Sequence, residues 1–224
     1  MKQLRELAEQ RKRELELREK QKAEQEAEQL RTGQKVDLPI QQPRIVRSPS
    51  RRSLMITKDI EALELPNTVK MRFPKQGDQR EIEFLVSPDE GYWKTGNFLF
   101  NVKFPPEYNY QPPVVKCLTK VYHPQIDFNT SVCMSTLRMA KTENDGGWTA
   151  TRGLVDIIQN IICIFLDPDG SDALNVSVGN MMMQNRDQFE KNVKASMLGQ
   201  RVGGEAFEKQ PIQYDFPTSK QEAK

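Results

Sequence analysis

One cysteine and the single histidine of the chain lie close together near its middle. The stretch VYHPQIDFNTSVCM, residues 121–134, contains His123 and, ten residues later, Cys133. A thiolate is a strong nucleophile near neutral pH, and an imidazole can carry a proton in the same range. The spacing leaves two interpretations open: sulfur chemistry at Cys133, or a buried thiol near a loop histidine.

The other two cysteines have apolar neighbours in the sequence. Cys117 ends an apolar run, and Cys163 lies within IICIFL. Free cysteine is among the most buried residue types, so we expect both thiols to be inert parts of a core. Cys133 differs because it lies in a polar loop.

The elements that must position this loop begin with a helix and a sheet. Ile56, Ile60 and Leu63 recur at helical spacing from about Leu54 until Pro66. The period then changes to two in short runs separated by turns, which predicts an antiparallel meander of four strands. These runs cover residues 69–73, 82–86, 98–104 and 114–117.

Residues 118–150 have no sustained period and predict a long irregular loop, of the kind that often carries function. Apolar residues at helical spacing from Leu154 to Phe165 predict a helix buried beneath the sheet. A short helix around residues 176–183 and an amphipathic one through Phe189 and Val193 follow. The predicted fold class is α+β.

Composition limits the domain and its partners. Residues 1–53 lack aromatic side chains, so a charged extension and linker should precede a core of residues 54–207, followed by a polar tail, 208–224. A formal net charge of +2 argues against nucleic acid as the main partner. The longest apolar run, Ile161–Leu166, is too short to span a membrane. Three cysteines, without an apolar leader, indicate a reducing compartment, the cytosol or nucleus.

Several separated motifs, in order, resemble the ubiquitin-conjugating enzyme family. They are FPPEYNYQPP, then HPQ with the cysteine eight residues further on, then Trp148 and LDPDGSDALN. SPDEGYWKTGNFLF, PPVVKCLTKVYHP and RDQFEKNVKASMLGQRVGG are most similar to the branch that carries the Nedd-type modifier to cullins. The resemblance covers about residues 54–200 and implies the ubiquitin-conjugating fold.

The resemblance also implies acyl transfer through sulfur. Cys133 would accept the C-terminus of a ubiquitin-like modifier as a thioester from an ATP-dependent activating enzyme, and pass it to a lysine. It implies no metal and no organic cofactor. A RING-type ligase and a cullin substrate are the further partners of that branch.

By the same resemblance, Gln125 stands where the family has the asparagine that stabilises the oxyanion. Asp172 matches an acidic position that orients the lysine or takes its proton, though a turn residue is equally consistent with its sequence neighbours. His123 matches a loop-holding histidine, and Pro124 and Trp148 are structural at the site. Thr130 replaces a family glycine before the cysteine.

The branch places a partner-binding tail ahead of the first helix. In this chain we expect Leu4 and Leu7 of the charged extension to enter a groove on the activating enzyme. Three alternatives stay open: a ubiquitin-carrying enzyme, a catalytically weakened adaptor with the same fold, and a thiol hydrolase pairing Cys133 with His123.

Overall fold

The computed structural model describes residues 17, 20–21, 49–142 and 146–216. Contacts divide the chain into two units, Met1–Arg47 and Ser48–Lys224, and every element described below from α2 onward belongs to the second. Leu17, Lys20 and Gln21 are helical and exposed. The contacts predicted for Leu4 and Leu7 lie outside the described residues.

The sheet is the predicted antiparallel meander. Its strands pair in the order of the sequence, with Val69 opposite Val86, Phe84 opposite Phe100 and Val102 opposite Val115. The strands are β1 (Val69–Arg72), β2 (Glu81–Val86), β3 (Phe98–Lys103) and β4 (Val114–Cys117). Alternating side chains on one face are apolar, so this face must be covered.

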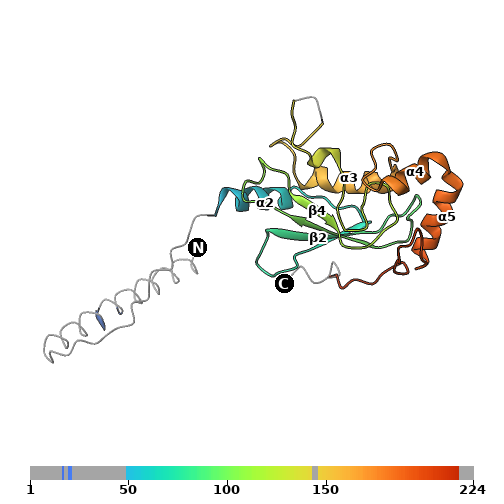
Figure 1. Cartoon of the computed structure of the whole chain (residues 1–224). Helices are drawn as coiled ribbons and strands as arrows, with labels where there is room; N and C mark the ends of the chain where they lie inside the picture. Colours follow the sequence, from blue (N-terminus) through green and yellow to red (C-terminus); the bar gives the residue numbers. More distant parts are fainter. Residues whose placement is uncertain (1–16, 18–19, 22–48, 143–145, 217–224) are drawn as a thin grey trace, which may run out of the picture. The chain divides into compact units, whose positions relative to one another are not determined.

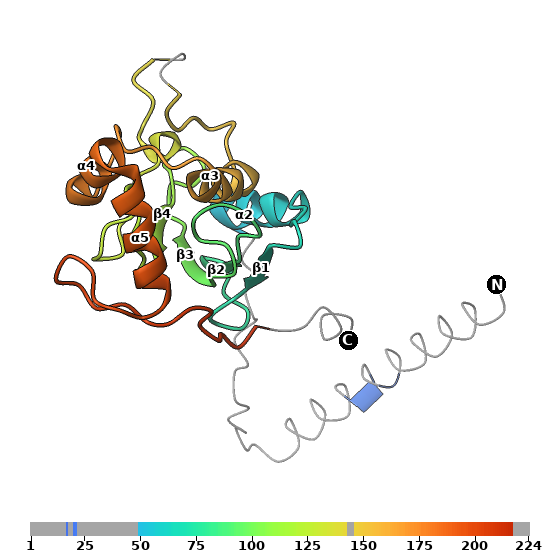
Figure 2. The ribbon, with the colours of Figure 1, turned by 90° about the vertical axis from the view of Figure 1, so that its right-hand side faces the viewer.

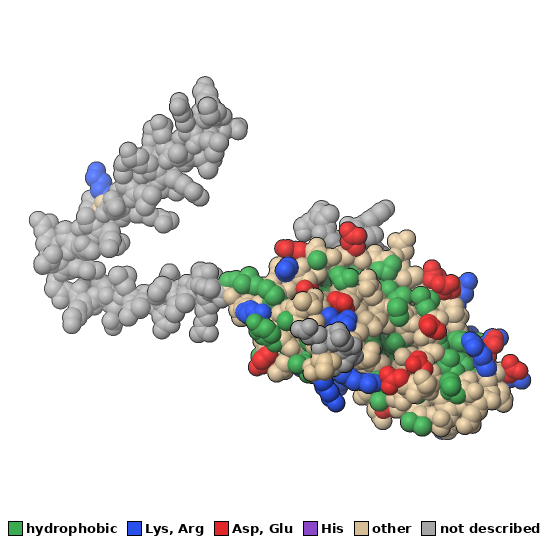
Figure 3. Space-filling view, turned by 90° about the horizontal axis from the view of Figure 1, so that it is seen from above, with side chains coloured by type: hydrophobic (Ala, Val, Ile, Leu, Met, Phe, Trp, Pro, Cys, Tyr) green, Lys and Arg blue, Asp and Glu red, His purple; other side chains and the backbone are tan. Residues whose placement is uncertain are grey.

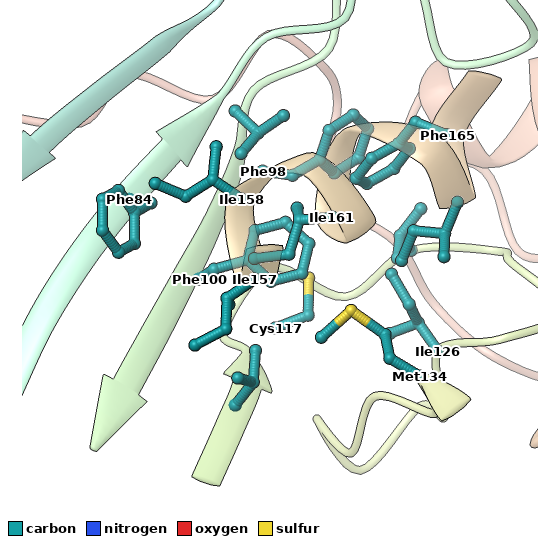
Figure 4. Close-up of a cluster of buried hydrophobic side chains, with 14 of the residues drawn as sticks. Phe84, Phe98, Phe100, Cys117, Ile126, Met134, Ile157, Ile158, Ile161 and Phe165 are labelled. Carbon is teal, nitrogen blue, oxygen red and sulfur yellow. The ribbon is translucent and has the colours of Figure 1, made fainter. Parts of the chain in front are cut away.

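Two helices cover that face: α2 (Arg51–Glu61) and α3 (Leu154–Leu166) (Figures 1 and 2). Side chains of α3 interdigitate with phenylalanines of β2 and β3 in the core (Figure 4). The labelled members are Phe84, Phe98, Phe100, Cys117, Ile126, Met134, Ile157, Ile158, Ile161 and Phe165. Ile126 and Met134 belong to the irregular loop of residues 118–150, which we call the functional loop, so packing in the core holds this loop in place.

Helix α2 begins before the expected boundary at Leu54. The Ser50 side chain caps it by accepting a hydrogen bond from the Ser53 amide at 3.2 Å, so the first helical residue is Arg51. Ile56 is buried under the sheet, and Ile60 and Leu63 pack against the core. The cap at Ser50 therefore extends the helix to the polar residues 51–53, ahead of the apolar positions.

Among the described helices, α3 carries the strongest apolar stripe. Its first turn is fixed by the carboxylate of Asp156, which accepts a hydrogen bond from the Gly153 amide at 2.9 Å. The prediction for Cys163 was wrong, because this side chain is exposed. Cys163 follows the buried Ile161 by two positions, which turns it about 200° around the helix axis, away from the sheet.

Two short helices follow at the end of the sheet near the loop: α4 (Val176–Gln184) and α5 (Arg186–Met197) (Figure 2). Asn175 caps α4 and Asn185 caps α5 through their side-chain oxygens. Phe189 and Val193 bury α5 in the core. Asn175 also donates its amide to the Pro124 carbonyl at 2.8 Å, which ties the start of α4 to the functional loop.

The outer face of the sheet is covered by residues 210–216, which we call the C-terminal strap. Phe216 and Tyr214 pack on Leu85 and Leu99, and the Tyr214 hydroxyl lies 2.6 Å from the Thr119 hydroxyl. Figures 1 and 2 show the segment after α5 passing along the face opposite to α3. The packed residues therefore extend beyond the predicted boundary at 207, because this polar segment contains two aromatic rings.

Charges of both signs are interspersed on the helix-bearing side of the molecule (Figure 3). This face presents no broad cationic field of the kind that holds nucleic acid through its phosphates. Within the described ranges, no helix combines the length and the apolar character that crossing a membrane requires.

Candidate active site

The three cysteines have different surroundings. Cys117 is buried in the core, where the loss of solvation raises its thiol pKa to about 12, as expected for an inert thiol. Cys163 is exposed on α3, whereas Cys133 is half-buried in the loop between β4 and α3. Of the three, Cys133 combines access to solvent with a charged side chain, Arg138, in contact with its sulfur.

The loop around Cys133 is held by backbone pairing. The Cys117 amide donates to the Thr130 carbonyl at 2.9 Å, and the Cys133 amide donates to the Gln125 carbonyl at 2.8 Å. Met134, the next residue, is buried in the core, and the short 3₁₀ helix η1 (Ser135–Leu137) follows it. The sulfur therefore lies at the rim of the core on a fixed backbone.

His123 is fully buried and holds the loop. Its Nε2 donates to the Ile164 carbonyl at 2.8 Å, and its Nδ1 accepts from the Gln125 amide at 3.0 Å. The ring lies against the Trp93 indole, with centroids 4.3 Å apart. Burial lowers its pKa to about 3, so the ring is neutral.

This geometry opposes the hydrolase alternative. A base for Cys133 would need a free imidazole nitrogen facing the sulfur. Both nitrogens of His123 are already bonded to backbone groups, and the ring is enclosed by aromatic side chains. Neither nitrogen of His123 is therefore free to act on the sulfur of Cys133.

The Gln125 side chain is anchored by its oxygen. Oε1 accepts a hydrogen bond from the Asp169 amide at 3.1 Å, which joins the loop to the segment after α3. Its Nε2 has no hydrogen-bond partner within the described part of the chain. The longer stem of glutamine is thus fixed at its end, and its amide donor is left for a ligand.

Arg138 bridges Asp172 and Cys133. Arg138 Nη2 lies 3.0 Å from the sulfur of Cys133 and 3.1 Å from both carboxylate oxygens of Asp172. Both charged side chains are exposed. The structure therefore brings Cys133, Asp172 and Arg138 together at the surface.

Trp148 supports Arg138 from the core side. Its buried indole donates to the Asn109 carbonyl at 2.9 Å, and its amide donates to the Arg138 carbonyl at 2.6 Å. Gly147 allows this close approach, because a Cβ there would lie 2.7 Å from Ala140 Cα and from the Arg138 carbonyl oxygen.

Arg138 is the residue that the sequence did not reveal. It follows Cys133 by five residues in a stretch without periodicity, and one arginine among many surface charges gives no signal.

The arrangement is suited to nucleophilic chemistry by sulfur. A guanidinium donor favours the thiolate, a free amide donor is available for a developing oxyanion, and a carboxylate can bind an amine. Among the described residues, no three His, Cys, Asp or Glu side chains are grouped to hold a metal ion.

Comparisons with known proteins identify the same part of the chain. A family model described as ubiquitin-conjugating enzyme matches residues 55–197. The Nedd8-conjugating enzyme UbcE2M of Drosophila melanogaster is 39% identical over 159 residues, which cover 71% of this chain and 84% of that protein. The NEDD8-conjugating enzyme UBC12 of Yarrowia lipolytica is 39% identical over 155 residues, 69% of this chain and 83% of that protein.

A solved structure has the same fold. Ubc12 of Saccharomyces cerevisiae is similar with a TM-score of 0.63 and 28% sequence identity, covering 86% of this chain and 97% of that one. The predicted ubiquitin-conjugating fold is thereby confirmed.

Proposed function

The chain belongs to the ubiquitin-conjugating enzyme family, and from this premise we propose that it carries a Nedd8-type modifier on Cys133 and transfers it to lysine. Enzymes of this family transfer a modifier through a cysteine thioester. The choice of modifier rests on relatives named as NEDD8-conjugating enzymes.

One observation carries the proposal. Cys133 is an accessible thiol at the rim of the core, hydrogen-bonded to Arg138 and tied through its amide to Gln125. In loading, its thiolate attacks the modifier's C-terminal carbonyl. The bond to the activating enzyme's sulfur breaks, and that sulfur leaves with the electron pair.

In the second step, a lysine amine attacks the thioester carbonyl. The Gln125 amide donates to the developing oxyanion, and Asp172 accepts the proton that the attacking nitrogen loses. The carbon–sulfur bond then breaks and Cys133 leaves as a thiolate. The products are an isopeptide bond, the free enzyme and a proton released to solvent.

The acceptor and the ligase are proposed from the branch that the sequence resembles. We infer a cullin lysine as the acceptor, a RING-type ligase as the docking partner, and an activating enzyme that binds the N-terminal extension through Leu4 and Leu7. The reaction requires a free thiol, which favours the cytosol or the nucleus.

The test is a charging assay. The protein is incubated with ATP and one matched pair of activating enzyme and modifier, either Nedd8 or ubiquitin, and is then run on gels with and without reductant. We expect a reductant-sensitive adduct with the Nedd8 pair. The Cys133→Ala variant should form none, and Cys133→Ser should give an adduct that resists reductant.

Cys163→Ala is the matched control, because it removes the other accessible thiol and should leave charging unchanged. Loss of the adduct in this variant and not in Cys133→Ala would refute the proposed site. Charging with ubiquitin alone would reassign the modifier, and an adduct that never reaches a lysine would support the adaptor alternative.

A further inference from the structure

Arg138 contacts the reacting sulfur of the proposed thioester site. Its Nη2 carries two N–H groups and lies within hydrogen-bond distance of Cys133 Sγ on one side and of the Asp172 carboxylate on the other. One nitrogen therefore contacts both the sulfur of Cys133 and the carboxylate of Asp172. Arg138 lies outside the sequence motifs that resemble the family.

The backbone at Arg138 is held by pairing with Trp148. The Trp148 amide and carbonyl pair with the backbone at Arg138 and Ala140, at 2.6 and 3.2 Å, and the buried indole anchors this pairing. A guanidinium on a fixed backbone loses less freedom when it binds than a side chain on a mobile loop. The main chain that carries Arg138 is therefore held beside Cys133 by a buried residue.

We propose that Arg138 is a catalytic residue that stabilises the sulfur of Cys133 as a thiolate and holds Asp172 beside it. This proposal rests on the proposed function, because the sulfur becomes charged twice in that reaction. It is a thiolate when it attacks the modifier and again when the carbon–sulfur bond breaks and the electron pair returns to it.

The hydrogen bond from Arg138 is stronger to a thiolate than to a thioester sulfur, which carries no charge. When the carbon–sulfur bond breaks, charge returns to the sulfur and this hydrogen bond strengthens, which lowers the barrier to transfer; in loading, the same hydrogen bond favours the thiolate before it attacks. The same guanidinium binds both oxygens of Asp172 along one side, so their remaining lone pairs stay available for the ammonium of an incoming lysine.

The experiment measures thiol reactivity without a modifier or an activating enzyme. In a Cys163→Ser background, Cys133 is the accessible thiol, since Cys117 is buried. Its alkylation by iodoacetamide is followed by mass spectrometry from pH 6 to 9. We expect Arg138→Gln to react about tenfold more slowly near pH 7, and the difference between the two proteins to narrow as the pH rises toward 9.

Arg80→Gln is the matched control. Arg80 also forms an exposed guanidinium–carboxylate pair, with Asp78, but has no contact with Cys133. Arg138→Lys keeps a positive charge, so its alkylation rate near pH 7 should lie between those of Arg80→Gln and Arg138→Gln. If Arg138→Gln and Arg80→Gln give the same pH profile, the proposal is overturned.

The charging assay distinguishes failure of the role of Arg138 from failure of the proposed modifier transfer. A protein that is never charged, but whose alkylation depends on Arg138, would refute the modifier transfer and leave the contact between Arg138 and sulfur standing. A protein that is charged and transfers normally in the Arg138→Gln variant, with an unchanged alkylation profile, would refute Arg138 alone.

Discussion

The amide of Cys133 and the carbonyl of Gln125 form a hydrogen bond of 2.8 Å, so the backbone that carries the nucleophile also carries the amide expected to serve the oxyanion. The Gln125 side chain extends from there to the Asp169 amide. Gln125 thus joins the backbone at Cys133 to the segment after α3.

Replacing Gln125 by alanine should separate the two steps of the reaction. The backbone bond to Cys133 persists, so charging should be nearly normal. Loss of the amide donor should slow discharge to free lysine by about 10²-fold, the usual cost of removing one oxyanion donor. Single-turnover discharge of the charged enzyme measures this rate.

Gln125→Asn restores an amide on a shorter stem and is the informative control. It keeps a donor but should lose the contact with the Asp169 amide. Discharge faster than in Gln125→Ala would assign the effect to the amide itself. Equal discharge by the alanine variant and the wild-type enzyme would contradict a role for Gln125 in the oxyanion.

The buried His123 predicts a loss of stability in mild acid. Its pKa is about 3 in the folded protein, whereas an unfolded histidine titrates near 6.5. Between these values the unfolded chain binds a proton that the native chain excludes, so stability is full above about pH 6.5 and falls as the pH is lowered. At pH 5.5 the expected loss is roughly 1 kcal/mol.

Urea unfolding at pH 7.5, 6.5 and 5.5 measures this loss. His123 is the only histidine, and the His123→Asn variant separates its contribution from that of the half-buried Asp59, whose pKa is raised by burial. The His123→Asn variant should be less stable at every pH, since the Asn side chain fills less of the site, yet should lose the dependence on pH over this range. A wild-type curve that is flat from 7.5 to 5.5 would refute the buried neutral ring.

The sheet and helices could be predicted because their side chains follow simple periods. Alternation gave all four strands, and helical spacing gave α3 and α5. Cys163 shows the limit of this reasoning. An apolar run identifies a buried helix but does not tell which of its members face away from the sheet.

The site was predictable only where a motif carried it. Cys133, Gln125 and Asp172 were identified by resemblance, whereas the contact of Arg138 with two of them depends on how an irregular loop folds over Trp148. The strap was missed for a related reason. Tyr214 and Phe216 are two rings in a polar segment, and their burial is created by the sheet face they meet.

Removing the two rings of the strap should destabilise the protein. Tyr214→Ala with Phe216→Ala would expose Leu85 and Leu99 and remove the stacking of Arg72 on Phe216, whose ring centroid lies 4.5 Å from the guanidinium carbon. We expect a loss of roughly 2 kcal/mol, which is the order of burying one aromatic side chain. Chemical unfolding measures it.

Gln213→Ala is the control for the strap, since Gln213 is exposed between the packed positions. It should leave the unfolding midpoint unchanged. Hydrogen exchange provides a second measurement, in which the amide of Ile212, bonded to Gln210, should exchange faster in the double variant. Equal midpoints for the double variant and the control would show that the strap adds no stability.

Thr130 has a backbone conformation that suits glycine. Its φ is 79°, in the left-handed region, where a β-branched residue is strained by roughly 1–2 kcal/mol. Its amide and carbonyl are nonetheless bonded to Asp127 and Cys117, which keep the residue in this conformation. Thr130→Gly should relieve the strain, offset in part by the greater freedom of glycine in the unfolded chain.

We expect Thr130→Gly to stabilise the protein by about 0.5 kcal/mol, measured by chemical unfolding. Thr130→Asn should show a smaller gain, because asparagine adopts this conformation more readily than other residues with a Cβ. Thr130→Ala keeps the Cβ and should show little gain. If the alanine variant is stabilised as much as the glycine variant, relief of the left-handed conformation is not the cause, and the effect lies in the threonine side chain.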